Sequence, residues 1–299
     1  MFANIRALAF EFVHRFHHRP RRLRAFRAHT GPFVHVTPDD LKFELVPGEI
    51  VDQYIATEGI YERRFLRFFR GVLPRGCVMI DIGANIGNHA LYLHDLCSAV
   101  HCYEPNPAAA RRLRQNIELN NATNIHVHEV GLGDRNATLA FASNVAGNLG
   151  NSGYLIGQEH QAGTFETIEL PIRRADEAIR ELALDRIDFI KIDVEGLEPQ
   201  IFSGLEQTIA RYRPLISFEF HAHLTPISAF EHIRECLPDY LIADMDFAPE
   251  DSGVVRRILY HLRHGTRLTL RTVTTPSART YESLLAIPNE HALQAQVGN

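Results

Sequence analysis

Two carboxylates stand at the ends of short apolar runs, where buried strands would bring them to one edge of a sheet. Asp81 lies near the end of a run that begins at Cys77, and Glu104 follows the next run, 23 residues after Asp81. Between them, Gly83 and Gly87 frame a loop that opens a helical stretch. Glycines let the backbone turn tightly and approach a ligand, and a helix N-terminus offers unpaired N–H groups. The pattern indicates a nucleoside site, with Glu104 accepting the ribose hydroxyls. The alternative is a pair of ordinary strand-end carboxylates in a doubly wound fold.

The glycine loop departs from the common phosphate-binding patterns. A dinucleotide site needs Gly-x-Gly-x-x-Gly, whereas Asn85 takes the second glycine position here and the spacing is Gly-x-Asn-x-Gly. No Walker lysine follows the loop. S-adenosylmethionine carries no phosphate, only an amino acid head, a sulfonium and adenosine. The loop therefore favours this cofactor, with Asp81 and the loop holding its ammonium and carboxylate groups and Glu104 its ribose.

Three motifs resemble those of the FkbM family of S-adenosylmethionine-dependent methyltransferases. They are Asp-Ile-Gly-Ala-Asn-Ile-Gly at 81–87, Glu-Pro-Asn at 104–106 and Ile-Lys-Ile-Asp-Val-Glu-Gly at 190–196, in this order. The resemblance runs from about residue 55 to about residue 245. It implies a class I methyltransferase fold and, most often, methylation of a hydroxyl on a sugar, polyketide or other natural product. It also adds Asn106 to the expected cofactor-binding residues.

The resemblance suggests where the adenine binds. In methyltransferases of this type the loop after the third strand meets the adenine. Here that loop, 131–134, ends at Asp134, which becomes a candidate acceptor for the exocyclic amine. The alternative is an ordinary turn aspartate that hydrogen bonds to its own backbone.

A second group of ionisable side chains follows or lies in two later predicted strands. Its members are Asp193, Glu195, Glu219 and His221. The first two follow the strand predicted at 187–192, which the class I order places next to the first core strand. The other two share one face of the strand predicted at 215–223, because side chains alternate along a strand. Since ligands bind beyond the carboxyl ends of such strands, we expect the four groups to converge.

Two chemistries suit such a cluster. His221 or Asp193 acts as a general base that takes the proton of an acceptor hydroxyl while its oxygen attacks the sulfonium methyl group. Alternatively, two or three of the groups bind a divalent cation that lowers the pKa of the hydroxyl. We favour the base over the metal. A third option is catalysis by proximity and orientation alone. Lys191, inside the strand, is assigned a structural role.

Other functions fit the sequence less well. An NAD-dependent oxidoreductase or epimerase would keep Glu104 but lacks the third glycine and any Tyr-x-x-x-Lys pair. A non-catalytic binding protein with the same fold stays open. DNA and amine methyltransferases of the adenine type place Asn or Asp before Pro-Pro and an aromatic after the fourth strand, where this chain has Asp-Val-Glu-Gly at 193–196. Oxygen is therefore the favoured acceptor, no nucleic acid partner is expected, and amide or amine acceptors stay open.

Composition indicates a globular protein of a reducing compartment. The 299 residues are 45% hydrophobic and 22% charged, which is ordinary for a soluble globular protein. The four cysteines form no Cys-x-x-Cys pair, so neither a zinc ribbon nor a disulfide framework is expected. No apolar run approaches 18 residues, and the stretch 1–16 lacks a signal-peptide cleavage site. We expect a cytoplasmic protein without a transmembrane segment.

The chain divides into three parts. Residues 1–50 are predicted to form a basic helical arm and a short hairpin, 51–250 the methyltransferase domain, and 251–299 a C-terminal extension. The domain is expected to be a class I, Rossmann-like α/β sheet of seven strands with helices on both faces. An amphipathic helix is predicted at 59–72, and 274–299 is predicted to be a weakly ordered tail or a docked helix.

The basic arm and a polar stretch are the other distinctive segments. Residues 1–30 carry a net charge of +6, which leaves −11 for the remainder. The helix predicted at 2–28 packs on the main domain or a second subunit; the alternative is peripheral contact with an anionic membrane surface or a charged acceptor. The Gly- and Asn-rich stretch 143–163 is predicted to be a substrate loop. The sequence does not predict the oligomeric state.

Overall fold

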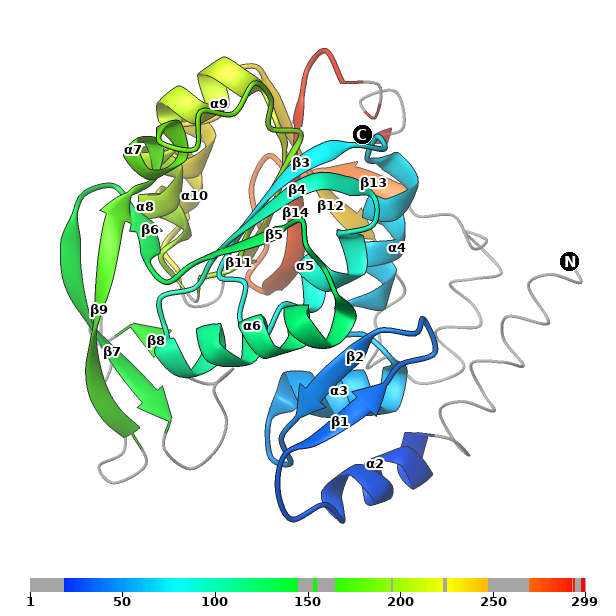
Figure 1. Ribbon diagram of the computed structural model, residues 1–299. Coiled ribbons are helices and arrows are strands. Elements are labelled where there is room, and N and C mark those ends of the chain that lie inside the picture. Colours follow the sequence, from blue (N-terminus) through cyan, green and yellow to red (C-terminus); the bar gives the residue numbers. More distant parts are fainter. Residues whose placement is uncertain are drawn as a thin grey trace, which may run out of the picture.

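A nine-stranded mixed sheet forms the centre of the molecule (Figure 1). The computed structural model describes residues 19–144, 153–154, 165–194, 196–222, 225–246, 269–291, 293 and 297–298. From one edge to the other, the strands are β15 (Val297–Gly298), β13 (Thr269–Thr272), β12 (Tyr240–Asp246), β14 (Thr280–Pro288), β11 (Leu215–His221), β10 (Phe189–Ile192), β3 (Cys77–Ile82), β4 (Cys97–Tyr103) and β5 (Ile125–His128). The α/β class I arrangement is confirmed, and β13 and β15 extend the sheet beyond the seven strands expected.

The parallel centre of the sheet brings the predicted site strands together. Strands β5, β4, β3, β10 and β11 are parallel neighbours, and β14 runs antiparallel to β11 and β12. The expected neighbourhood of β10 and β3 is confirmed, with Lys191 in register with Asp81 on one side and Ser217 on the other. Every residue of β3 and of β10 is buried, because helices cover both faces of a parallel sheet and its strands become continuous apolar runs.

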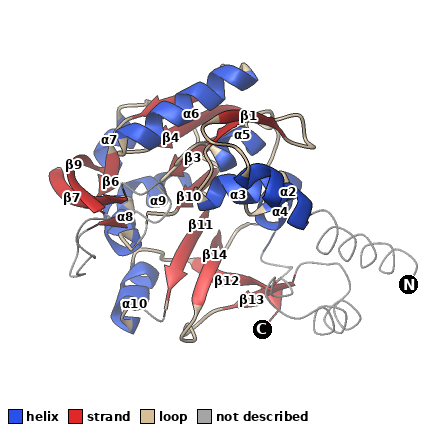
Figure 2. Cartoon of the chain, turned by 90° about the horizontal axis from the view of Figure 1, so that it is seen from below, coloured by secondary structure: helices blue, strands red, loops and turns tan. Residues whose placement is uncertain are grey.

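Helices pack on both faces of this sheet (Figure 2). Along β3, Met79 belongs to one apolar cluster and Ile80 to the other, because alternate side chains point to opposite faces. The first cluster contains residues of α4 (Arg63–Val72), α5 (Asn88–Leu93) and α6 (Pro107–Asn120). The second contains residues of α7 (Ala175–Arg180), α8 (Glu198–Gly204), α9 (Glu206–Tyr212) and α10 (Ile227–Glu235).

The prediction of a helix at 59–72 is wrong about where the helix begins. A preceding helix, α3 (Ile50–Glu58), ends at Gly59, whose φ of 90° is left-handed, and α4 begins only at Arg63. Glu62 also has a positive φ, of 54°. The residues between the two helices therefore form a bend, which the amphipathic pattern of the following residues did not reveal.

The C-terminal segment differs most from expectation. Strand β14 lies inside the sheet between β11 and β12, whereas 274–299 was predicted to be a tail or a docked helix, and the boundary at 250 left it outside the domain. Leu284, Leu285 and Ile287 are fully buried. An apolar run this short, at 284–287, gives little sequence signal, and its burial depends on pairing with residues at least 40 positions away in the chain.

A second, four-stranded sheet lies beside the first. Its order is β6 (Gly131–Gly133), β9 (Phe165–Arg174), β7 (Ala137–Asn144) and β8 (Gly153–Tyr154), and Figure 1 shows β7 and β9 extending away from the main sheet. Most of the stretch 143–163 lies outside the described residues, so its role as a substrate loop stays a prediction.

The N-terminal hairpin is held against the helix that follows Glu104. The structure contains α2 (Arg19–Arg27) and the predicted hairpin of β1 (Phe33–Val36) and β2 (Lys42–Leu45), while residues 2–18 of the predicted arm lie outside the described residues. Asn116 on α6 accepts a hydrogen bond from the backbone of Glu44 and donates one to the carbonyl of Ile86. One side chain thus connects the hairpin to the glycine loop.

Within the described ranges, no helix is both long and apolar enough to cross a membrane.

Candidate active site

The glycine loop is fixed by close backbone approaches. Gly83 has a φ of 79°, and a Cβ atom there would collide with the backbone oxygen of Asp193 at the end of β10. Gly87 has a φ of 90°, and a Cβ atom there would overlap the side chain of Leu113 on α6. Only glycine combines this backbone conformation with this clearance. The two glycines therefore seat the loop between β10 and α6.

Glu104 braces the loop from the end of β4. Its Oε2 accepts a hydrogen bond of 2.8 Å from the backbone N–H of Asn85, and its Oε1 accepts one of 2.9 Å from the N–H of Asn106. Burial raises the pKa of Glu104 to about 7. Each carboxylate oxygen has a second lone pair for a ligand hydroxyl. Asn106 itself caps α6 by accepting a hydrogen bond from the N–H of Ala108, and its role in cofactor binding stays a prediction.

Asp81 lies beneath the loop with an unsatisfied carboxylate. The side chain is fully buried, and among the described residues neither of its oxygens accepts a hydrogen bond. Its nearest cation is the ammonium of Lys191, with 3.8 Å between Nζ and Oδ1. A buried carboxylate without hydrogen-bond donors is costly, so this arrangement suits a ligand that brings a cationic or N–H group.

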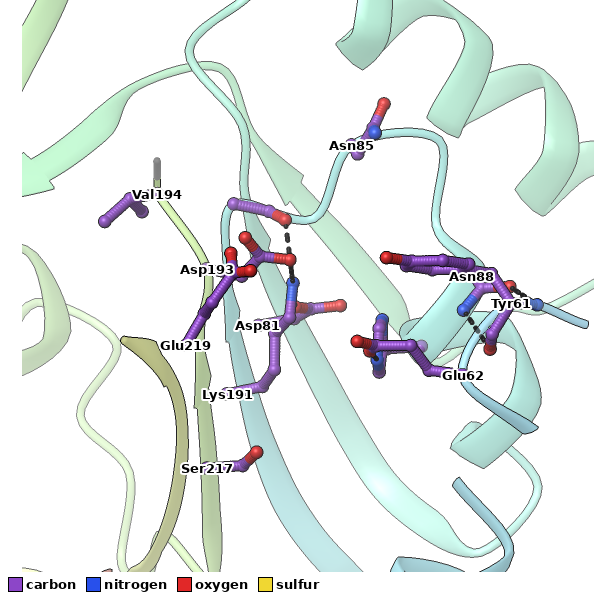
Figure 3. A network of polar contacts seen from close by, with 12 residues as sticks. Tyr61, Glu62, Asp81, Asn85, Asn88, Lys191, Asp193, Val194, Ser217 and Glu219 are labelled. Carbon is purple, nitrogen blue, oxygen red and sulfur yellow. Dashed lines mark hydrogen bonds and ion pairs between the residues drawn. The ribbon is translucent and has the colours of Figure 1, made fainter. Parts of the chain in front are cut away.

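Lys191 is a site residue that the sequence analysis missed. Its Nζ donates hydrogen bonds of 3.1 Å to the carbonyl of Gly83 and to Oδ2 of Asp193. Figure 3 shows the end of the Lys191 side chain beside Asp193. Burial acts to lower the pKa of Lys191, but the charges of Asp193 and Asp81 outweigh it and raise that pKa. A usable signal was present: Lys191 interrupts a fully apolar strand, and it lies two residues before Asp193 on the same face.

The neighbouring carboxylates Asp193 and Glu219 differ in proton affinity. Burial acts to raise the pKa of Asp193, but the ammonium of Lys191 outweighs it and leaves that pKa below its usual value. Burial raises the pKa of Glu219 to about 7, and the charge of Asp193 adds to this shift. Environments that push the pKa values of two neighbouring carboxylates apart are typical of sites in which the two groups have different roles.

His221 completes the cluster at the end of β11. Its Nε2 lies 3.4 Å from Oε1 of Glu219, and its Nδ1 is hydrogen bonded to the hydroxyl of Thr280 on β14 at 3.1 Å. The structure therefore brings Asp193, Glu219 and His221 together, as expected from the strand order. Glu195 lies outside the described residues. Within the described part of the chain, no three His, Cys, Asp or Glu side chains are arranged as a metal site.

Asp134 is positioned by the turn after β6. Its side chain is 40% exposed and its Oδ2 lies 3.6 Å from the guanidinium of Arg135. An exposed pair of adjacent residues contributes little to stability, so this contact does not fix the carboxylate. Its contact with adenine stays a prediction.

A matched pair of substitutions tests the close approach of the glycine loop to the end of β10. Gly76 and Gly83 have nearly equal φ values, 76° and 79°, but only at Gly83 does an added Cβ meet another atom within 4 Å. We expect Gly76→Ala to lower the free energy of unfolding by about 1–2 kcal/mol, the cost of a left-handed alanine. Gly83→Ala should cost about 1–3 kcal/mol more, because β10 and the loop must separate. Urea denaturation measures both, and equal losses would contradict the close approach.

Comparison with known proteins identifies a family to which this chain is similar. The Methyltransferase FkbM domain family matches residues 81–247, which is more than half of the chain and includes the glycine loop, Glu104, Asp193 and β11. A solved structure with a similar arrangement is the methyltransferase FkbM from Methylobacillus flagellatus, with a TM-score of 0.42, 15% identity, and coverage of 90% of this chain and 58% of that one.

Three curated relatives are each similar over about half of this chain. Methyltransferase 1 of Beauveria bassiana is 30% identical over 149 residues, covering 44% of this chain and 60% of the relative. The 2-O-methyltransferase NoeI of Sinorhizobium fredii is 30% identical over 148 residues, covering 46% and 60%. The 31-O-demethyl-FK506 methyltransferase FkbM of Streptomyces tacrolimicus is 29% identical over 182 residues, covering 52% and 68%. The matches to the first two thus span less than two thirds of those proteins. By the match across 81–247, the chain belongs to the FkbM methyltransferase family.

Proposed function

We propose that this protein is an S-adenosylmethionine-dependent O-methyltransferase that acts on a hydroxyl of a sugar, a polyketide or another small molecule. The observation that carries the proposal is the carboxylate of Asp81, which is fully buried beneath the glycine loop and accepts no hydrogen bond from any described residue. The ammonium of a methionine moiety is the cation that would complete it. The printed names of two relatives, a 2-O-methyltransferase and a 31-O-demethyl-FK506 methyltransferase, support oxygen as the acceptor.

The residues around the loop fit the parts of this cofactor. Asp81 would accept hydrogen bonds from its ammonium group, and Glu104 would accept them from the two ribose hydroxyls. Glu104 keeps free lone pairs for this role although it already braces the backbone of Asn85 and Asn106. When bound, the cofactor supplies a methyl group on a positively charged sulfur.

The acceptor hydroxyl loses its proton to the pair of Glu219 and His221. Glu219 has a pKa near 7, so it is ionised in part of the molecules at neutral pH and still has appreciable affinity for a proton. Asp193 is the weaker base, because Lys191 keeps its pKa low. We assign Asp193 the role of orienting the acceptor by accepting a hydrogen bond from it. A metal-assisted reaction is not part of the proposal.

A binding measurement tests the donor. We expect S-adenosylhomocysteine, the product of methyl transfer, to bind in calorimetric titration with an affinity near the micromolar range, about −8 kcal/mol. Glu104→Ala should weaken this binding because it removes the ribose acceptor, whereas the exposed Glu129→Ala should not. NAD, titrated in parallel, should give no signal. Clear binding of NAD without binding of S-adenosylhomocysteine would contradict the proposal.

A pH profile tests the base. Because the pKa of Glu219 is raised to about 7, the base is protonated below that pH and becomes available as the pH rises through it. With an acceptor found by screening hydroxylated compounds with labelled methyl donor, kcat/KM should rise between about pH 6 and pH 8. Glu219→Gln should lower kcat about 10²- to 10⁴-fold, the usual contribution of a general base, and keep the affinity for S-adenosylhomocysteine. A rate unaffected by both changes would refute this role for Glu219.

A further inference from the structure

The bend between α3 and α4 is fastened to the helix that follows the glycine loop. The side-chain amide of Asn88, the first residue of α5, accepts a hydrogen bond of 3.0 Å from the N–H of Tyr61 and donates one of 3.0 Å to its carbonyl. Both bonds use the backbone of Tyr61 and leave its phenol free to serve another purpose. Asn88 is 4% exposed, so water does not compete with this pairing.

A second contact fixes the same bend. The carboxylate of Glu62 lies 2.7 Å from Nε2 of His89, the second residue of α5. Both side chains of this pair are largely buried, at 12% and 9% exposure. With Asn88 and His89 holding consecutive residues of the bend, Tyr61 cannot move independently of the glycine loop. The bend is therefore a fixed wall of the proposed donor site.

The phenol of Tyr61 extends from this anchor into the site. Figure 3 shows its ring reaching from Asn88 toward the side on which Asp81, Asp193 and the glycine loop lie. Burial raises the pKa of Tyr61, and the nearby charges of Glu62, Asp193 and Glu219 raise it further. The hydroxyl is therefore neutral at physiological pH and can donate a hydrogen bond. Within the described part of the chain, this hydroxyl has no hydrogen-bond partner.

The loop itself has few N–H groups left for an anion. The N–H groups of Gly83 and Ala84 both point to the carbonyl of Tyr103. The N–H of Asn85 is bonded to Glu104, and the N–H of Gly87 to the carbonyl of Ala84. The sequence analysis expected the loop to hold the cofactor's carboxylate, but four of its N–H groups are already engaged. A carboxylate placed beside the negative charges of Asp81 and Asp193 would be stabilised by a further hydrogen-bond donor.

We propose that Tyr61 is a donor-binding residue whose hydroxyl donates a hydrogen bond to the α-carboxylate of the methyl donor, while Asp81 accepts hydrogen bonds from its ammonium. The assignment rests on the proposed function. Tyr61 and Asp81 would thus bind the carboxylate and the ammonium of the amino acid head. Asn88 acts as the positioning residue that holds Tyr61 in place. The site would then discriminate against ligands that lack the carboxylate.

Paired ligands and a matched control test this contact. S-adenosylhomocysteine and its decarboxylated analogue are titrated into the wild-type protein, Tyr61→Phe and Tyr54→Phe. The rings of Tyr54 and Tyr61 meet edge to face, with centroids 5.4 Å apart. Tyr54→Phe therefore controls for a change in the packing around Tyr61. We expect Tyr61→Phe to weaken S-adenosylhomocysteine about 10- to 100-fold, as for a hydrogen bond to a charged group, and to leave the analogue unchanged. Tyr54→Phe should change neither affinity.

The outcomes separate this inference from the function on which it rests. If the wild-type protein binds no S-adenosylhomocysteine, the proposed function fails. If the wild-type protein binds it and Tyr61→Phe binds it equally well, only the role of Tyr61 fails. Equal weakening of both ligands by Tyr61→Phe also overturns the inference, because the lost interaction would then not involve the carboxylate.

Discussion

The buried ammonium of Lys191 is the interaction on which the site depends. It lies between the carboxylates of Asp81 and Asp193 and also donates to the carbonyl of Gly83. Asp81 on β3 stands in register with Lys191, and Asp193 follows Lys191 by two residues just beyond β10, so the two carboxylates would repel each other without a counter-charge. A buried charge left without its partner typically costs about 3–5 kcal/mol. Lys191 therefore joins the two central strands and the glycine loop into one unit.

The same charge sets the chemistry available at the strand ends. Because Lys191 neutralises Asp193, this carboxylate stays ionised and binds protons weakly. Glu219 lies farther along the sheet, next to Asp193 and His221, and burial there raises its pKa to about 7. The ammonium of Lys191 thus makes the pKa values of the two carboxylates differ: Asp193 is ionised at neutral pH, whereas Glu219 titrates near it. Under the proposed function, the first orients the substrate and the second takes its proton.

Local features of the site were predictable from the sequence, and features that depend on distant pairing were not. The strand, the loop around Gly83 and the position of Glu104 follow from patterns within the stretch 77–104, and the neighbourhood of β3 and β10 followed from the family's strand order. The role of Lys191 required knowing that it stands opposite Asp81, 110 residues earlier. Tyr61 escaped notice because its anchor, Asn88, lies 27 residues away in the chain. Strand β14 was not predicted because its burial depends on pairing with β11 and β12, which are distant in the sequence.

The most direct test of this account is the free energy of unfolding of Lys191→Met, measured by urea denaturation alone and combined with Asp193→Asn. The single substitution keeps the volume of the side chain and removes its charge. We predict a loss of about 3–5 kcal/mol for the single variant, because Asp81 and Asp193 are left without a counter-charge. The double variant should recover part of that loss, because it removes one of the two uncompensated carboxylates. A Lys191→Met protein as stable as the wild type would contradict the central role of this ammonium.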